Sequence, residues 1–277
     1  MNQTLRLIHD RCSLRRYRKA PLGRDRVEAI LDAALRAPTA GNMMLYTILE
    51  ITLSETKAAL ARTCGHGFIA EAPTVLVFLA DMQRWVDYYD AYGVPEECAA
   101  CGEPMQMPDL GKLFLGCCDA MAAAQTSVIA AESLGVGSCY VGDIMGDAET
   151  HRDLLGLPRW SFPVALVCYG DAPPDATRTP TARFDRRFIV FRDRYKRLSK
   201  AELDEMLSDV AVRFADVLRT HGVSLAAMTY RHFSAGAAAR TLGEQVARQL
   251  EPWCDRLEHT PRPDPVDPDT GSPREPS

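Results

Sequence analysis

The sequence has no run of 18 apolar residues, the length that a membrane-spanning helix needs. Its most apolar stretch, residues 120–137, is interrupted by Gln125, Thr126, Ser127 and Glu132. The first residues, MNQTLRLIHDRC, contain neither an apolar segment nor a cleavage pattern, so we expect no secretion signal. These absences predict a cytoplasmic protein that neither crosses nor binds a membrane.

A regular cysteine framework is also missing. The nine cysteines are odd in number and irregularly spaced, which argues against a disulfide scaffold and favours reduced thiols. Cys98 and Cys101 form a C-x-x-C pair, and Cys117 and Cys118 follow it. Adjacent helical cysteines point about 100° apart, so both seldom reach one ion. We therefore predict no metal site, and zinc or iron–sulfur binding and a redox-active Cys98–Cys101 pair remain weaker alternatives.

The chain lacks an excess of positive charge. Its formal net charge is -5 and its pI is about 5.7, whereas nucleic-acid binding needs a basic face that releases counterions. A role without catalysis, in which the basic segments bind nucleic acid, is thereby disfavoured. Neither a P-loop nor a G-x-G-x-x-G fingerprint is present, which argues against ATP and against a Rossmann dinucleotide site.

What is present is enough apolar sequence for a full core, 47% of 277 residues. Residues 22–36 and 112–134 have helical periodicity, and a further helix is expected at 147–155. Residues 45–53, 72–81 and 162–171 are short, apolar and rich in β-formers, which predicts strands. The segment VGSCYVGDI, residues 136–144, is expected to be a short strand that leads into a loop. Strands alternate irregularly with helices, so the class is α/β or α+β.

Three segments have distinctive compositions. Residues 85–111 lack clean periodicity, which predicts a loop or lid with a helical turn or two. The aromatic residues of this segment have the spacing of one helical face: Trp85, Tyr88, Tyr89 and Tyr92. These side chains either pack in the core or line an acceptor pocket. The helix at 112–134 carries small residues at helical spacing, which permit close approach of another backbone. The last stretch, 257–277, holds six of the eighteen prolines and is expected to be disordered.

The stretch DRCSLRRYRK, residues 10–19, places Arg11, Ser13 and Arg15 at alternate positions. An extended backbone would put these three side chains on one side, where two guanidinium groups and a hydroxyl could clamp a phosphate. The neighbouring Arg16 and Arg18 would then face away from the phosphate. The alternative is a solvated basic segment.

Two glycine-containing loops follow. APTAGN, residues 37–42, ends the first amphipathic helix and offers polar groups on Thr39 and Asn42. GVGSCYVGDI, residues 135–144, contains three glycines that let a flat ligand approach the backbone.

The order of these motifs resembles the FMN-dependent nitroreductase family. The resemblance covers residues 5–195 and rests on Arg-x-Ser-x-Arg, on Ala-Pro-Thr-Ala-Gly-Asn before a strand, and on FLGCCDAMAAAQTSVIAAESLGVGSCYVGDI. It implies an α+β fold with a central, mostly antiparallel β-sheet flanked by helices, in an intertwined homodimer whose long helices pack together. We divide the chain into an FMN-binding domain, 1–197, a helical C-terminal extension, 198–256, and the tail, 257–277.

The resemblance also implies a cofactor site and a reaction. FMN would be bound by the following residues: Arg11, Ser13, Arg15, Pro38, Thr39, Asn42, Tyr140, Val141, Gly142, Asp143 and Arg183. Hydride would pass from NAD(P)H through the flavin to a small electron acceptor, such as a nitroaromatic compound or a quinone, with ping-pong kinetics and no catalytic side chain. A specialised reaction with a cysteine-containing lid (dehydrogenation, dehalogenation or flavin breakdown) is the alternative.

The sequence departs from the family pattern in two places. Met44 stands where many relatives have glutamine, so a hydrogen bond to the flavin edge is lost or replaced. Thr181-Ala182-Arg183 stands where many relatives have Lys-x-Arg, so phosphate binding is expected to depend more on the N-terminal arginines.

Overall fold

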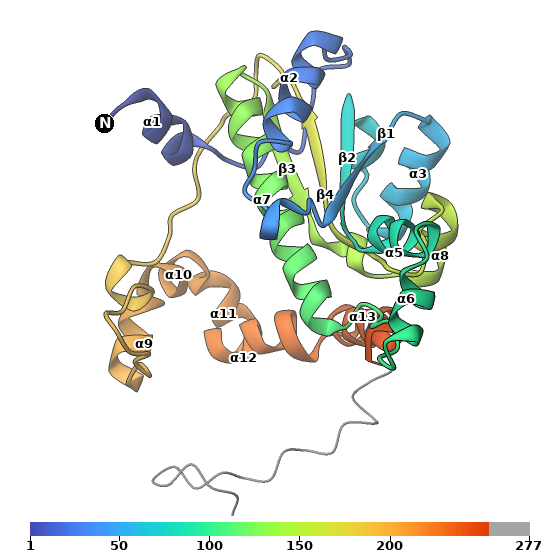
Figure 1. The fold of residues 1–277 in the computed structure, drawn as a ribbon. Helices are drawn as coiled ribbons and strands as arrows, with labels where there is room; N and C mark the ends of the chain where they lie inside the picture. The colour runs from blue at the N-terminus through green and yellow to red at the C-terminus, as the bar shows by residue number, and fades with distance from the viewer. Residues whose placement is uncertain (255–277) are drawn as a thin grey trace, which may run out of the picture.

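The centre of the protein is a four-stranded antiparallel β-sheet, as the predicted fold class requires. The computed structural model describes residues 1–254, so the predicted disordered tail at 257–277 and the last two residues of the predicted extension lie outside the described residues. The strands are β1 (Tyr46–Ile51), β2 (Thr74–Asp81), β3 (Gly137–Val141) and β4 (Ser161–Gly170). Their order is β1-β2-β4-β3 (Figure 1).

The two central strands, β2 and β4, are buried along their whole length. This explains why their sequences are apolar without alternation, because each strand is covered on both faces. The β2–β4 pairing shifts register between Phe78 and Leu79. The edge strand β3 forms the middle of the second glycine-containing segment, residues 135–144.

Helices cover both faces of the sheet (Figure 1). On one side, α2 (Arg24–Ala34) and α7 (Leu110–Ser133) form a core cluster with apolar side chains of β2 and β4. A second cluster on the other side includes Leu60 of α3 (Ser54–Thr63) and Ile69 of α4 (Phe68–Glu71), and α8 (Ala148–Leu155) packs against it. The predicted helices at 22–36, 112–134 and 147–155 are therefore confirmed with small changes of boundary.

The small residues of α7 face the protein's own sheet. Gly116, Ala120, Ala124, Ser127 and Ala131 are buried. A Cβ on Gly116 would lie 3.0 Å from both the Ala80 Cβ and the Leu45 carbonyl oxygen. The family resemblance implied that this helix packs against the same helix of a second subunit. The small residues of α7 do not form such a contact, because they pack against β2 of the same chain.

The length and composition of α7 are also those of a membrane-spanning helix, with a mean hydropathy of 1.5. Ten of its residues are buried, and the helix packs against α2 and the sheet. A core helix has the same apolar composition as a membrane span, and the packing of α7 accounts for it.

Residues 83–100 are more helical than the sequence predicts. They form α5 (Gln83–Ala91) and α6 (Val94–Ala100). Trp85 and Tyr89 are half-buried, whereas Tyr88 and Tyr92 are 49% and 69% exposed, so the aromatic face packs inward along only one edge. Gly93, with φ of 74°, begins α6 and separates the two helices.

The C-terminal extension is helical, as predicted, and consists of four short helices and one longer one within the described residues. They are α9 (Lys200–Met206), α10 (Ser208–Arg213), α11 (Ala215–His221), α12 (Leu225–Tyr230) and α13 (Ala237–Cys254). Gly222, in the left-handed conformation, ends α11, and a π-helical turn at 231–235 precedes α13. Figure 1 shows the chain leaving the sheet towards α9 and returning through α12 to α13.

The last described helix, α13, packs against the rest of the protein through a tryptophan. Trp253 of α13 is 2% exposed and meets Trp160 edge-to-face, with ring centroids 5.2 Å apart. The last described helix therefore belongs to the main core.

Candidate functional site

The stretch at residues 11–15 is extended and lies against the edge of the sheet. After α1 (Gln3–Asp10), Ser13 forms an isolated parallel bridge with Ser138 of β3, and the Leu14 N–H donates to the Ser138 carbonyl at 2.8 Å. Cys12 and Leu14 are buried, whereas Ser13 and Arg15 are exposed. A Cβ on Gly137 would lie 2.5 Å from Leu14, so this glycine permits the contact.

The predicted clamp residues gather beside one side chain of β3. Burial raises the pKa of the Cys139 thiol, and Arg15, Ser13 and Arg11 oppose that rise, because all three lie close to the sulfur. The alternation that the sequence predicts thus brings the three polar groups to one edge of the sheet.

The arginines of this stretch differ in their partners. Arg16 forms an ion pair with Asp175 at 2.8 Å, and the Arg18 Nε donates to the Ala172 carbonyl at 2.9 Å. Within residues 1–254, Arg11 and Arg15 form no ion pair with a carboxylate. Two guanidinium groups are therefore available for an anion from outside the protein.

The loop at residues 37–45, called the first loop here, is organised by Asp119 of α7. This carboxylate is 5% exposed and accepts hydrogen bonds from the Thr39 hydroxyl, the Ala40 N–H at 3.1 Å and the Leu45 N–H at 3.2 Å. The Thr39 Oγ1 also accepts the Met44 N–H at 2.8 Å. Asp119 was not among the predicted site residues, although an acidic residue within the small apolar stretch 116–124 was a signal for it.

The backbone of the first loop is strained. Gly41 and Asn42 both have φ of 58°, and Met44 has φ of 48°. A non-glycine residue with positive φ is uncommon, and such residues gather at functional sites. Pro38 and Asn42 are exposed, and the loop includes the short 3₁₀ helix η1 (Ala40–Asn42).

The second predicted segment, Tyr140–Asp143, presents its residues in different directions. Tyr140 is half-buried and its hydroxyl donates to the Gln125 Oε1 at 3.3 Å, while Val141 is buried in the core. Burial raises the pKa of Tyr140. Gly142 and Asp143 are exposed, and the nearest atom to a Cβ on Gly142 would be the Met145 Cε at 3.8 Å. Only Gly142 and Asp143 therefore offer an open edge.

Residues 142–147, called the second loop here, are held by distant side chains. The buried His151 bonds through Nδ1 to the Ile144 carbonyl at 2.9 Å and through Nε2 to the Thr63 hydroxyl at 2.7 Å. Two glutamines of α13 add contacts. The Gln249 Nε2 donates to the Met145 carbonyl at 2.6 Å, and the Gln245 Oε1 accepts the Asp147 N–H at 2.6 Å. Sequence reasoning missed all three residues.

Arg183 lies apart from this cluster. Its guanidinium donates to the Thr181 carbonyl at 3.0 Å, and it lines a surface pocket with residues of α9 and α10. A different arginine of the connector, Arg178, pairs with the buried Glu132 of α7 at 2.7 Å and lies beside Cys12. The structure thus brings Arg11, Ser13 and Arg15 together, but not Arg183.

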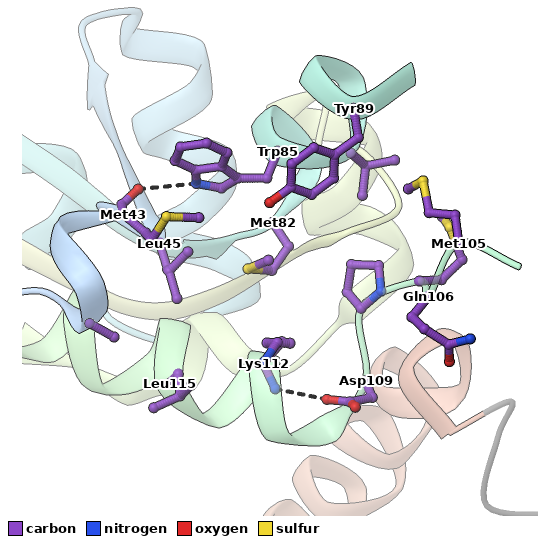
Figure 2. Close-up of a pocket in the computed structure, with 14 residues that line it drawn as sticks. Met43, Leu45, Met82, Trp85, Tyr89, Met105, Gln106, Asp109, Lys112 and Leu115 are labelled. Carbon is purple, nitrogen blue, oxygen red and sulfur yellow. Dashed lines mark hydrogen bonds between the residues drawn. The ribbon is translucent and has the colours of Figure 1, made fainter. Parts of the chain in front are cut away.

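A cavity of about 480 Å³ adjoins the first loop. Figure 2 shows Trp85 and Tyr89 of α5 on one side and Lys112 on the other, with Met82 between them. Ala40, Met43 and Leu45 form the wall towards the first loop. Trp85 and Tyr89, but not the other two aromatic residues of the predicted lid, line this cavity.

The cysteines are all free thiols. Burial raises the pKa of Cys117 to about 11 and that of Cys64 to about 12, so both stay protonated at neutral pH. Among residues 1–254, no group of three or more His, Cys, Asp or Glu side chains is arranged to hold a metal ion.

Comparison with known proteins places these features in a family. Residues 8–171 match the Nitroreductase family. An NADPH-dependent oxidoreductase of Staphylococcus epidermidis is 27% identical over 220 residues, covering 78% of this chain and 84% of the relative. An NADPH-flavin oxidoreductase of Vibrio harveyi is 29% identical over 210 residues, covering 75% and 80%.

A solved structure has the same fold. The NADPH:FMN oxidoreductase from Vibrio harveyi, in complex with NAD+, superposes with a TM-score of 0.74 at 22% identity, covering 90% of this chain and 98% of that one. Together with the sheet and the two loops, the family match shows that this chain belongs to the nitroreductase family.

Proposed function

We propose that the protein is a homodimeric, cytoplasmic oxidoreductase that binds FMN and transfers hydride from NAD(P)H to a small electron-poor acceptor, such as a nitroaromatic compound or a quinone. Membership of the nitroreductase family supports it, as do the relatives' names, one an NADPH-flavin oxidoreductase. The observation that carries the proposal is the pair Arg11 and Arg15 beside β3. Arg11 is half-buried and Arg15 is exposed, and neither has a carboxylate partner in residues 1–254, whereas their neighbour Arg16 is paired.

The residues present fit FMN. Arg11, Ser13 and Arg15 supply two cations and a hydroxyl beside β3, which suits a phosphate group. The first loop presents the exposed Asn42, whereas the Thr39 hydroxyl is already bonded to Asp119 and to the Met44 N–H. The second loop presents the exposed Gly142, where an added Cβ would meet no atom closer than the Met145 Cε at 3.8 Å. The rest of the predicted set is Pro38, Tyr140, Val141, Asp143 and Arg183. Of these, Val141 is buried in the core and Arg183 comes from a different part of the surface.

When bound, FMN supplies hydride transfer, so NAD(P)H and the acceptor alternate at one site with ping-pong kinetics. The chain's own residues bind and orient. The arginines hold the phosphate, Asp119 keeps the first loop in its strained form, and His151 and Gln249 fix the second loop. None of these residues exchanges a proton with the substrate in this proposal.

Exposed apolar residues support the homodimer. On the outer face of α7, Phe114 is 65% exposed and Met121 is 41% exposed, opposite the small residues that meet the sheet. In the extension, Val212 and Phe233 are 76% and 74% exposed. Apolar surface of this extent suits burial against a second copy of the chain.

The test compares two arginines of the same stretch. We expect the purified protein to be yellow, Arg15→Ala to lose most of its flavin absorbance, and Arg16→Ala to retain it. A colourless protein that does not take up added FMN would overturn the proposal, as would equal loss in both variants. Initial rates with NADPH and a quinone are expected to give parallel reciprocal plots; intersecting plots would contradict the shared site.

A further inference from the structure

Two carbonyl groups of the first loop are bonded to helix α5. The indole N–H of Trp85 donates to the Met43 carbonyl at 3.0 Å (Figure 2), and the Arg84 Nη1 donates to the Met44 carbonyl at 3.2 Å. Two N–H groups of the same loop are bonded to Asp119 of α7 instead. The first loop is therefore held from α7 through its donors and from α5 through its acceptors.

A buried carboxylate sets the direction of the Arg84 side chain. Asp81 is 9% exposed, and one of its oxygens accepts the Gln83 N–H at 2.9 Å, where α5 begins. Its other oxygen accepts the Thr47 hydroxyl, and the Thr47 oxygen in turn accepts the Arg84 Nη2 at 2.8 Å. The same Nη2 lies 3.7 Å from the Asp81 carboxylate. Because the guanidinium group is planar and rigid, bonds in two directions leave it one orientation, although half of the side chain is exposed.

The residue that Arg84 contacts in the first loop is a strained one. Met44 has φ of 48°, and both of its backbone polar groups are bonded, the N–H to the Thr39 hydroxyl at 2.8 Å and the carbonyl to Arg84. A strained conformation persists only where the surrounding structure holds it. Arg84 therefore helps to hold the Met44 backbone, and does so from outside the loop.

Helix α5 has few attachments to the core. Val86 is the only buried residue among its nine, and α6 contains none. Elements with few buried contacts open locally at a low free energy. The bonds from Arg84 and Trp85 to the first loop therefore matter more for α5 than they would for a helix packed in the core.

We propose that Arg84, together with the Trp85 N–H, couples the first loop to α5, so that a ligand that orders the loop also orders the helix. For FMN the inference rests on the proposed function, which places the flavin at the first loop, whereas the bond between loop and helix does not depend on it. Arg84 is then a positioning residue, since it acts through Met44. Such coupling is reciprocal, so α5 favours FMN binding by the factor by which FMN favours the ordered helix.

The first experiment measures hydrogen exchange in the full-length protein without FMN. Arg84→Met keeps the aliphatic stem and removes both donors, and exchange is expected to become about fivefold faster at residues 40–45 and at residues 83–91, with residues 142–147 unchanged. Trp85→Phe, which keeps a ring and removes the N–H, is expected to act in the same direction.

The control is Arg36→Met, an exposed arginine beside the first loop whose side chain makes no hydrogen bond or ion pair within residues 1–254. It is expected to leave both segments unchanged. Equal effects of Arg36→Met and Arg84→Met, or faster exchange in only one of the two segments in Arg84→Met, would overturn the proposal.

The second experiment adds FMN to protein freed of flavin. Exchange at residues 83–91 is expected to slow in the wild type and not in Arg84→Met, and the Kd for FMN, measured by quenching of flavin fluorescence, rises about fivefold in that variant. Arg84→Lys keeps the charge but not the fork and should recover only part of the slowing. Equal slowing in the wild type and Arg84→Met, or full recovery with lysine, contradicts the role of Arg84. If the wild type binds no FMN, the proposed function fails, and the exchange of the flavin-free variants still decides whether Arg84 couples loop and helix.

Discussion

The first and second loops are held in place in different ways. The first loop depends on one buried carboxylate, Asp119, which belongs to the core helix α7 and lies within the family match at 8–171. The second loop depends on His151, inside that match, and on Gln245 and Gln249 of α13, which lie beyond it. One loop is therefore shaped by the family core and the other partly by the C-terminal extension.

This difference has a physical basis. A single ionised group can accept several N–H and O–H donors at once, so one residue suffices to hold the strained first loop. The second loop offers a carbonyl at Met145, which needs a donor, and an N–H at Asp147, which needs an acceptor, and both come from neutral side chains. Two glutamines, four residues apart on one face of α13, meet both needs.

The largest expected effect is at Asp119. Asp119→Ala leaves three donors of the first loop unpaired and should lower the free energy of unfolding by about 3 kcal/mol. It should also increase hydrogen exchange at residues 40–45 while residues 142–147 stay protected. Urea unfolding and exchange measurements check this, with Asp119→Asn, which keeps an acceptor, as the milder control. Unchanged protection of the first loop would show that Asp119 does not hold it.

A smaller effect is expected at Gln249. Gln249→Leu removes the donor to the Met145 carbonyl and should cost about 1–2 kcal/mol. Exchange should rise at residues 142–147 and not in the first loop, the reverse of the Asp119 pattern. Arg248→Leu, an exposed change on the same helix, serves as the control. If both variants behave alike, the extension does not support the second loop.

The smallest effect is expected at His66. Its Nε2 lies 3.1 Å from the Asp143 carboxylate, and the two side chains are 42% and 55% exposed. Exposed pairs contribute little, so His66→Ala should change the free energy of unfolding by less than about 0.5 kcal/mol. A loss comparable to that of Gln249→Leu, measured in the same urea series, would make His66 a third anchor of the second loop.

Local patterns predicted the conformation of the N-terminal stretch and of the central strands. The spacing predicted that Arg11, Ser13 and Arg15 lie on one side of an extended backbone, whose side chains alternate. In the structure Cys12 and Leu14 are buried, Ser13 and Arg15 are exposed and Arg11 is half-buried. The strands β2 and β4 were visible as unbroken apolar runs for a different reason, because each is covered on both faces. The prediction that residues 85–111 are mainly a loop was wrong, because they include most of α5 and all of α6. The sequence did not show this, because the aromatic face of α5 packs inward along only one edge, which blurs the helical periodicity.

The sequence by itself therefore determined the α+β class, the main helices and strands, and the two loops with the polar residues they present. Only the tertiary structure decided what holds those loops, that the small face of α7 meets its own sheet, and that Arg178, not Arg183, packs beside the N-terminal stretch. Asp119 lies 79 residues from Ala40 along the chain, and Gln249 lies 104 residues from Met145. Contacts over such separations leave no periodic trace in the sequence, because they depend on how whole elements pack and not on the conformation of neighbouring residues.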